Sequence, residues 1–219
     1  MKKKVIYIDI DGTICTQTDS NYEKAKPFKK AINKINELYN QGNTIVVYTS
    51  DQGQFLGEHD YFDKRWMYEE SLRMPFVIRY PKKIKPKQRN NDMLLNIDFA
   101  PTFLDIAGVE IPKEMQGRSF KSNLFGQTPD DWRTSMYYRY WMHLSAHYNP
   151  GHYGIRTENY KLIFFYGLPL GQKGASKEIT APYWEFYDLK KDPKEMNNLY
   201  QDRSYQQIIE QLKKELLLK

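Results

Sequence analysis

The first fifty residues contain two apolar runs separated by a helical pattern. Val5–Ile10 is a β-branched apolar run that leads into acidic residues and a glycine, which predicts a buried strand. Apolar residues between Ala31 and Tyr39 recur at helical spacing, and Gly42 follows as a stop signal. Thr44–Thr49 predicts a second buried strand. This order predicts a right-handed βαβ unit with parallel strands, and ligands of such sheets gather beyond the carboxyl ends of the strands.

Beyond residue 75 the pattern predicts another strand, a helix, and then a region of short aromatic strands. The strand is Phe76–Tyr80, and the helix is Asp98–Ala107, with Asp98 as its N-cap and Gly108 as its stop. An amphipathic helix is expected over Tyr205–Leu218. Gly, Pro and Asn separate the later strands, which favours an antiparallel sheet made of residues 136–140, 153–156, 162–166 and 184–189.

We therefore predict an α/β fold, in which a parallel-sheet core with a βαβ start precedes a small antiparallel α+β C-terminal subdomain. The boundary falls between about residues 126 and 136, in a polar segment. No internal repeat is found.

Composition and charge narrow the class of protein. The chain has 219 residues, of which 40% are hydrophobic and 27% charged, so it is a folded protein and not a disordered tail. The net charge is +6, but the lysines are scattered and accompany no nucleic-acid motif, so we expect a solvated surface and no nucleic-acid partner. No apolar run approaches the ~20 residues of a membrane span. No signal peptide is seen either, so we expect a cytoplasmic protein without a membrane partner. The oligomeric state stays open.

Polar groups stand at the tips of both N-terminal strands. Asp9–Thr13 follows the first strand, and Thr49 and Ser50 end the second. In these residues the segment 1–50 resembles the haloacid dehalogenase superfamily. The resemblance implies a phosphatase in which Asp9 is the nucleophile and Asp11 the general acid/base, while Thr49 or Ser50 holds the phosphoryl oxygens beside Mg²⁺. The alternative is an acid-tipped strand in an unrelated α/β fold.

A second series of short motifs runs from residue 43 to the C-terminal region. In chain order these are Asn43–Gly53, Gly57–His59, Asp63–Arg65, Met67–Pro75, Asn96–Thr102, Gln116–Ser119, Tyr153–Thr157 and Phe186–Pro193. Together they resemble the C-terminal half of a type I sulfatase of the alkaline phosphatase superfamily. The resemblance implies hydrolysis of a sulfuric ester, with a small-molecule or glycan sulfate ester as the partner.

The sulfatase resemblance implies roles for a few polar residues. Asp51 and Gln52 match the pair that ligates Ca²⁺ or Mg²⁺, and a hard cation would bind the side-chain carbonyl of Gln52. Lys64 matches the lysine that contacts the sulfate and helps the leaving oxygen depart. Asp63 is the neighbour that we expect to keep this lysine charged.

Two histidines are candidates for reading the sugar. His59 and His152 could face the substrate, because sulfated sugars are recognised by hydrogen bonds from such residues. A lone histidine is also often a satisfied surface or core group, and this alternative stays open for both.

The sulfatase nucleophile has no counterpart in the sequence. It is a formylglycine made from Cys or Ser within Cys/Ser-x-Pro/Ala-x-Arg, and neither Cys15 nor any serine has that setting. The family's strand with adjacent aspartates is absent as well. We therefore expect that the established sulfatase mechanism does not run on this chain alone. The alternatives are a haloacid dehalogenase-type phosphatase and an inactive fusion remnant.

The two resemblances overlap on the second N-terminal strand. They divide the chain into a haloacid dehalogenase-like segment at 1–50, a sulfatase-like core segment at 43–130, and a sulfatase C-terminal subdomain at 131–219. We hypothesise that Asp9 and Asp11 replace the missing acidic strand and join Asp51 and Gln52 in a four-oxygen cation site.

Overall fold

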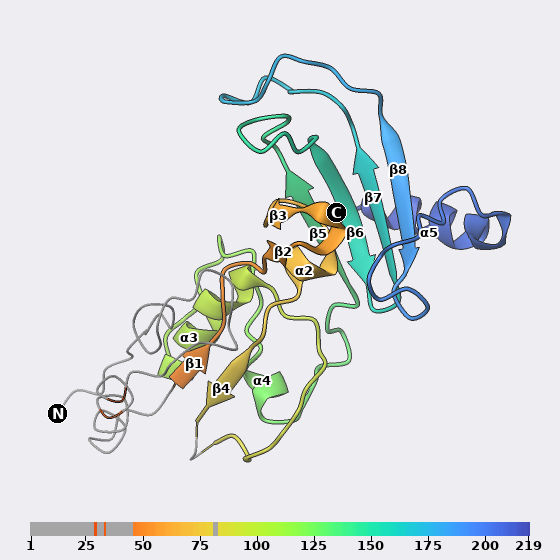
Figure 1. Ribbon diagram of the computed structural model, residues 1–219. Coiled ribbons are helices and arrows are strands. Elements are labelled where there is room, and N and C mark those ends of the chain that lie inside the picture. The colour runs from red at the N-terminus through yellow and green to blue at the C-terminus, as the bar shows by residue number, and fades with distance from the viewer. Residues whose placement is uncertain (1–28, 30–32, 34–45, 81–82) are drawn as a thin grey trace. The chain divides into compact units, whose positions relative to one another are not determined.

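The computed structural model describes residues 29, 33, 46–80 and 83–219 (Figure 1). The chain divides into two compact units, and each is described by itself. Unit 1 comprises residues up to Asp51 together with Pro75–Asp130, and unit 2 comprises Gln52–Met74 together with Asp131–Lys219. The segment that we assigned to 43–130 therefore contributes to both units. The strand expected at 5–10 and the βαβ unit that it would form lie outside the described residues.

Unit 1 contains a short pair of strands. β1 (Val46–Tyr48) and β4 (Val77–Arg79) occur where the sequence predicts strands, and they pair antiparallel, with Val47 opposite Ile78. A parallel core is thus not seen among the described residues. The other elements of the unit are η3 (Asn96–Asp98), α3 (Phe99–Ala107) and α4 (Lys121–Leu124).

Helix α3 begins and ends at the residues that its sequence predicts. Gly108 adopts a left-handed conformation with φ of 72°, which stops the helix. Asp98 is the N-cap residue, but its carboxylate makes no side-chain capping bond to the helix. Instead it is fully buried and accepts hydrogen bonds from the backbone N–H groups of Leu95 (2.7 Å) and Arg118 (2.9 Å). Asp98 therefore joins the start of the helix to the loop before α4.

Unit 2 is built around a four-stranded antiparallel sheet in the order β5-β6-β7-β8 (Figure 1). This confirms the antiparallel sheet expected from the alternation of aromatic strands and turns. The strands are β5 (Ser135–Tyr140), β6 (His152–Thr157), β7 (Tyr160–Phe165) and β8 (Tyr183–Asp188). The remaining elements are β2 (Phe55–Leu56), η2 (Glu58–Asp60), β3 (Phe62–Asp63), α2 (Glu69–Leu72), η4 (Arg203–Tyr205) and α5 (Gln206–Leu216).

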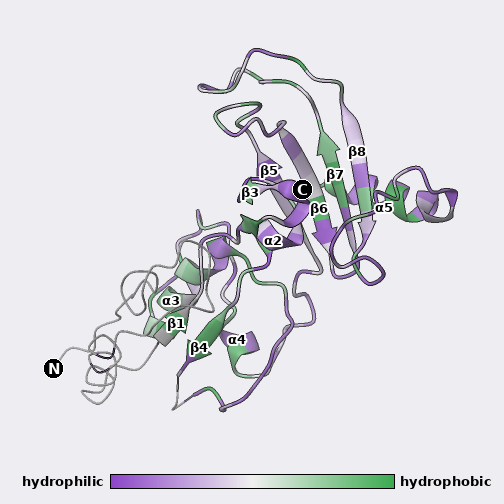
Figure 2. Cartoon of the chain, in the orientation of Figure 1, coloured by the Kyte–Doolittle hydropathy of each residue, from purple (hydrophilic) through white to green (hydrophobic). Residues whose placement is uncertain are grey.

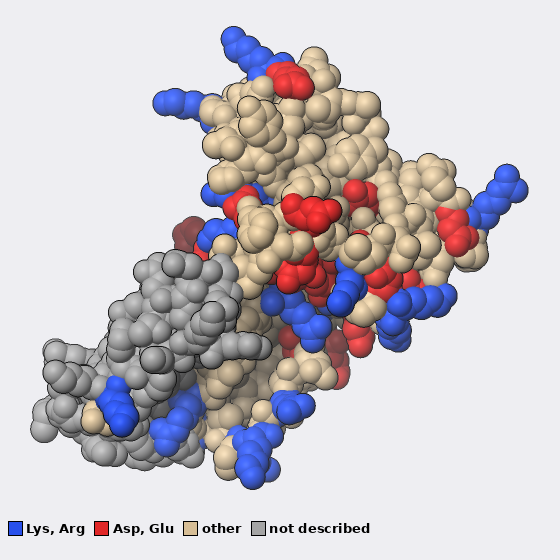
Figure 3. All heavy atoms as spheres, viewed as in Figure 1, with Lys and Arg blue, Asp and Glu red and all other residues tan. Residues whose placement is uncertain are grey.

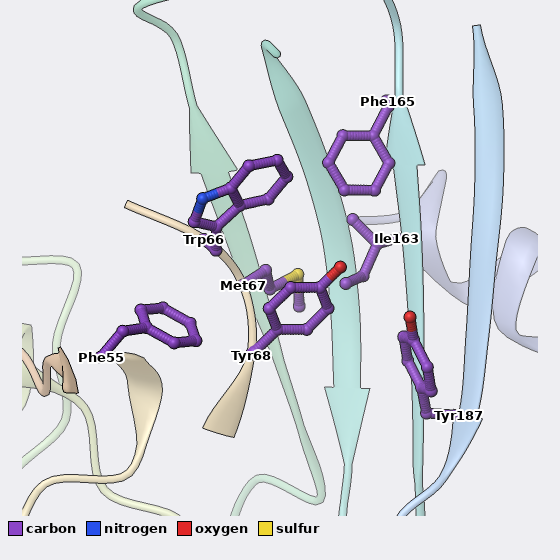
Figure 4. Close-up of a cluster of buried hydrophobic side chains, with 7 residues drawn as sticks. All are labelled: Phe55, Trp66, Met67, Tyr68, Ile163, Phe165 and Tyr187. Carbon is purple, nitrogen blue, oxygen red and sulfur yellow. The ribbon is translucent and has the colours of Figure 1, made fainter. Parts of the chain in front are cut away.

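The two faces of this sheet bury different partners. Strands alternate their side chains between faces, so hydrophobic and hydrophilic residues are interleaved along them (Figure 2). One face packs against the amphipathic helix α5, and this cluster contains Ile155, Leu162, Phe186, Tyr205, Ile209, Leu212 and Leu216. The other face packs against the segment 52–74. Figure 4 shows Phe55, Trp66, Met67 and Tyr68 of that segment beside Ile163, Phe165 and Tyr187.

The surface carries charges of both signs. On the face drawn in Figure 3, lysines and arginines are scattered and several stand beside acidic groups. This arrangement agrees with a solvated surface and not with one continuous basic patch on that face. Among the described residues, no helix is long and apolar enough to cross a membrane.

Candidate functional site

Two residues that the sulfatase resemblance selects in unit 2, Gln52 and Lys64, meet at one tight turn. Gly53 donates its N–H to the carbonyl of Ser71 at 2.8 Å, which holds the turn on helix α2. A Cβ atom at Gly53 would stand 2.0 Å from the carbonyl oxygen of Glu70, so this close approach requires glycine. The turn and α2 are therefore locked together.

Gln52 and Lys64 are brought together by this turn although they are far apart in the sequence. The Nε2 group of Gln52 donates to the carbonyl of Lys64 and, at 2.9 Å, to the hydroxyl of Ser71. That hydroxyl in turn donates to the same carbonyl of Lys64. Ser71 is completely buried, and no motif in the sequence indicates its role. It fixes the backbone of the predicted catalytic lysine next to the predicted metal ligand.

Asp63, the residue that we expect to keep Lys64 charged, forms an ion pair with Arg65. Its effect on Lys64 stays a prediction. The second oxygen of Asp63 faces Nδ1 of His147 at 3.7 Å. Asp63 thus connects the end of β3 to Arg65 and to His147 in the loop after β5.

His59 lies in a half-buried position beside α2. Its ring stacks on Tyr68, with centroids 4.5 Å apart and planes at 12°, and its Nε2 atom is 3.7 Å from a carboxylate oxygen of Glu70. The backbone of His59 has a φ of 53°, an uncommon conformation for a residue with a side chain. The contacts are those of a group held by its neighbours, and the substrate-binding role remains a prediction.

His152 is in the core of the unit and has no exposed surface. Its Nδ1 atom lies 2.7 Å from the carbonyl of Pro150, and its ring packs against Phe165 and Trp66. Burial lowers the pKa of His152 to about 4, although the hydrogen bond to Pro150 opposes the shift. The side chain is therefore neutral at pH 7. This placement favours the alternative of a core histidine, while the substrate-binding role remains a prediction.

In unit 1, three of the predicted residues follow strand β1. The hydroxyl of Thr49 donates weakly to the carbonyl of Ser50 (3.4 Å), and the hydroxyl of Ser50 donates to the exposed carboxylate of Asp51 (3.3 Å). The carbonyl of Asp51 accepts a hydrogen bond from the side chain of Asn96, in η3. The chain at Asp51 is thereby fixed to the start of helix α3.

Two of the predicted cation ligands, Asp51 and Gln52, are among the described residues. A carboxylate at Asp51 and an amide at Gln52 are hard oxygen donors of the kind that Ca²⁺ and Mg²⁺ prefer. Because the amide nitrogen of Gln52 makes two hydrogen bonds, its carbonyl oxygen would be the ligand atom. Calcium takes about six to eight oxygens. The described residues contain no cluster of three His, Cys, Asp or Glu that could hold a metal ion. Each of the two residues thus offers an oxygen atom of the kind that such a cation prefers; Asp51 belongs to unit 1 and Gln52 to unit 2. Asp9 and Asp11 lie outside the described residues, so their proposed contribution remains a hypothesis.

A buried ion network that no sequence pattern predicted holds α2 against the sheet. Lys161 has no exposed surface, and its Nζ atom lies 2.6 Å from a carboxylate oxygen of Glu195 and 3.0 Å from one of Glu69. Arg156 makes two further hydrogen bonds to the carboxylate of Glu69, at 2.9 and 3.2 Å. The second oxygen of Glu195 accepts the backbone N–H of Glu69 at 2.7 Å. The network anchors the helix that carries Ser71.

The two carboxylates of this network have opposite pKa shifts. Burial disfavours the charged form of both. For Glu195 burial dominates and raises the pKa to about 7, although Lys161 opposes it. For Glu69 burial is outweighed by the charges and hydrogen bonds of Lys161 and Arg156, and the pKa falls to about 2. At neutral pH, Glu69 is the carboxylate that carries the full negative charge.

Comparisons with known proteins identify the family of the chain. Residues 57–219 match the family described as N-sulphoglucosamine sulphohydrolase, C-terminal. The chain is 51% identical over 176 residues to N-acetylglucosamine-6-O-sulfatase of Bacteroides thetaiotaomicron, which covers 80% of this chain and 29% of that protein. It is 31% identical over 186 residues to an arylsulfatase of Clostridium perfringens, covering 84% of this chain and 35% of that protein. The chain therefore belongs to the sulfatase family.

A solved structure gives the same result. It is described as a complex with its substrate D-glucosamine-2-N,6-O-disulfate, and it matches with a TM-score of 0.76 and 45% identity over 86% of this chain and 37% of that chain. The chain thus spans about a third of the length of the relatives that it matches. The comparisons support the sulfatase resemblance, and they do not support the haloacid dehalogenase resemblance of residues 1–50.

Proposed function

We propose that this chain forms the C-terminal part of a sulfatase that hydrolyses a sulfuric ester on a glucosamine residue, at the 6-position. The observation that carries the proposal is the 51% identity with N-acetylglucosamine-6-O-sulfatase over 176 residues. The solved relative that is described with a disulfated glucosamine supports the same substrate class.

In this proposal, Lys64 binds the sulfate group. Its ammonium attracts the sulfate oxygens and stabilises the negative charge that develops on the leaving sugar oxygen. The hydrogen bonds from Gln52 and Ser71 to the Lys64 carbonyl fix the origin of the side chain. Such fixed positioning reduces the entropy that must be lost when the substrate binds.

Asp51 and Gln52 would each supply an oxygen ligand to the divalent cation, Ca²⁺ or Mg²⁺. When bound, such a cation polarises the sulfate ester and offsets its charge. The residues of this chain orient the sulfate. The formylglycine motif is not present in these 219 residues, so the proposal concerns sulfate binding and leaving-group stabilisation by this part of the protein.

The test is a titration of the 219-residue chain with N-acetylglucosamine 6-sulfate, by calorimetry, in Ca²⁺, in Mg²⁺ and in chelator. We expect Lys64→Met to raise the Kd at least about tenfold, because a charge-assisted hydrogen bond is lost. Lys214→Met is the matched control, since Lys214 is an exposed lysine of α5. We also expect binding to weaken in chelator.

Two results would contradict the proposal. One is equal affinity of the Lys64→Met variant and the unchanged chain for the sulfated sugar. The other is equal affinity of the unchanged chain for N-acetylglucosamine with and without its 6-sulfate, since the sulfate is the group that Lys64 recognises.

A further inference from the structure

The edge strand β5 presents an unusual set of side chains on the face of the sheet that α5 also covers. Residues 137 and 139 share this face because side chains alternate along a strand. Trp141 follows directly after the strand and contacts Arg139. Tyr137 is 38% exposed and Trp141 is 47% exposed. We call Tyr137, Arg139 and Trp141 the β5 edge surface.

Arg139 is held by aromatic rings. Its guanidinium carbon lies 3.4 Å from the centre of the Trp141 ring, and 5.7 and 5.6 Å from the rings of Tyr153 and Tyr166. A side-chain hydrogen bond also joins it to Tyr166. Within the part of the chain that the structure describes, Arg139 makes no ion pair with a carboxylate. A fixed guanidinium without an acidic partner attracts an anion from solution.

The loops next to this surface are fixed in place. The hydroxyl of Tyr166 donates to the carbonyl of Tyr140 at 2.9 Å. The buried ring of His143 accepts the N–H of Gly151 on Nδ1 (2.9 Å), and its Nε2 atom therefore donates to the carbonyl of Glu178 (3.1 Å). The loops before β6 and before β8 are thus joined through one side chain. A surface that is rigid before binding loses little entropy when a ligand binds.

The chemistry of the β5 edge surface matches a sulfated sugar chain. The guanidinium of Arg139 lies against the Trp141 ring, and Tyr137 is on the same face of β5, two residues before Arg139. Aromatic rings offer flat apolar contact to sugars, and a planar guanidinium makes paired hydrogen bonds to oxyanions. Aromatic rings and a guanidinium occur together on the β5 edge surface.

We propose that the β5 edge surface is a binding site for a sulfated oligosaccharide, in which Arg139 binds a sulfate group and Trp141 and Tyr137 contact sugar rings. The inference rests on the proposed function, from which it takes sulfated sugars as the class of ligand. It adds that the ligand is a chain of sugars and not a single sugar. The surface lies on the opposite side of the sheet from Tyr138, which contacts Gln52. Binding at the β5 edge surface therefore does not require Lys64.

The test uses a heparin hexasaccharide and its chemically desulfated counterpart, titrated into the 219-residue chain by calorimetry. All proteins carry Lys64→Met, so that the site proposed above does not contribute. We expect Arg139→Gln and Trp141→Ala each to raise the Kd for the sulfated hexasaccharide at least about tenfold. The matched control is Arg203→Gln, which removes the same charge at an exposed position in η4. It should change the Kd by less than about twofold.

Further variants separate the contributions and guard against misfolding. Trp141→Phe keeps an aromatic ring and should retain most of the affinity, while the desulfated hexasaccharide should bind at least about tenfold more weakly than the sulfated one. The proposal is overturned if the chain does not bind the sulfated hexasaccharide, or if Arg139→Gln binds it as tightly as Arg203→Gln does. If only the proposed function were wrong, Lys64→Met would bind N-acetylglucosamine 6-sulfate with the same Kd as the unchanged chain.

Discussion

Replacing Lys161 by methionine should strongly destabilise unit 2. The ammonium of Lys161 has no exposed surface and stands 2.6 Å from Glu195 and 3.0 Å from Glu69. Methionine keeps much of the side-chain volume but leaves both carboxylates without this cation. Glu69 retains Arg156, whereas Glu195 loses its ion-pair partner. Removing one partner of a buried ion pair costs about 3–5 kcal/mol, because the remaining charge is buried without compensation.

The loss of stability caused by Lys161→Met should depend on pH. Burial already raises the pKa of Glu195 to about 7, and losing Lys161 raises it further. A carboxyl group whose folded pKa lies above its unfolded value stabilises the fold below the unfolded pKa, and this contribution is lost as pH rises through the folded pKa. The free energy of unfolding of Lys161→Met should therefore fall between about pH 5 and 8 relative to the unchanged chain.

The assay is urea unfolding followed by tryptophan fluorescence, at pH 5.5 and pH 8. All four tryptophans lie in unit 2, so the signal reports this unit. The control is Lys214→Met, which removes the same charge at an exposed position of α5. Exposed charges contribute about 0–1 kcal/mol, so this variant should be close to the unchanged chain.

A second variant tests the cause. Adding Glu195→Gln to Lys161→Met removes the unpaired charge while keeping an oxygen that can accept the N–H of Glu69. The double variant should recover part of the lost stability. The reasoning is refuted if Lys161→Met lowers the free energy of unfolding no more than Lys214→Met does at pH 8, or if the loss is the same at both pH values.

Two further predictions concern the turn and the buried histidine. Gly53→Ala should lower the free energy of unfolding by about 1–3 kcal/mol, since the new Cβ would meet the carbonyl of Glu70, and an unchanged thermal midpoint would contradict this. His152 has its pKa lowered to about 4, so its stabilisation is complete above the unfolded pKa of about 6.5 and is lost as pH falls toward 4. Glu195 acts in the opposite direction between pH 7 and 4.5. On acidification from pH 7 to 5, the unfolding free energy should therefore fall more steeply in Glu195→Gln than in the unchanged chain, and less steeply in His152→Phe; equal slopes in urea titrations would refute this assignment.

Much of the local structure of the described residues was predictable from the sequence. The alternation of aromatic residues and the turn residues between them predicted β5 to β8, and the helical spacing of Ile209, Leu212 and Leu216 predicted α5. The glycine after α3 predicted its end. These features depend on residues close together in the chain, so a pattern within about ten residues is sufficient to define them.

The site was predicted in part. The resemblance to sulfatases selected Gln52 and Lys64, and the structure places the Gln52 side chain on the Lys64 backbone. Ser71, which joins them, could not be predicted, because the sequence around a buried serine in a short helix does not differ from that around an exposed serine. The carboxylates of Asp63 and Asp98 also have partners that the local pattern does not reveal, namely the guanidinium of Arg65 and the backbone N–H of Arg118.

The sequence by itself determined the family, the order of β5 to β8 and α5, and the residue types of the candidate site. Only the tertiary structure decided that Gln52–Met74 belongs with residues 131–219, that Lys161 is buried between Glu69 and Glu195, and that His152 is in the core. The physical reason is that these facts depend on contacts between distant segments. The free energy of a charged or polar side chain is set by the groups that surround it after folding, and not by its neighbours along the chain.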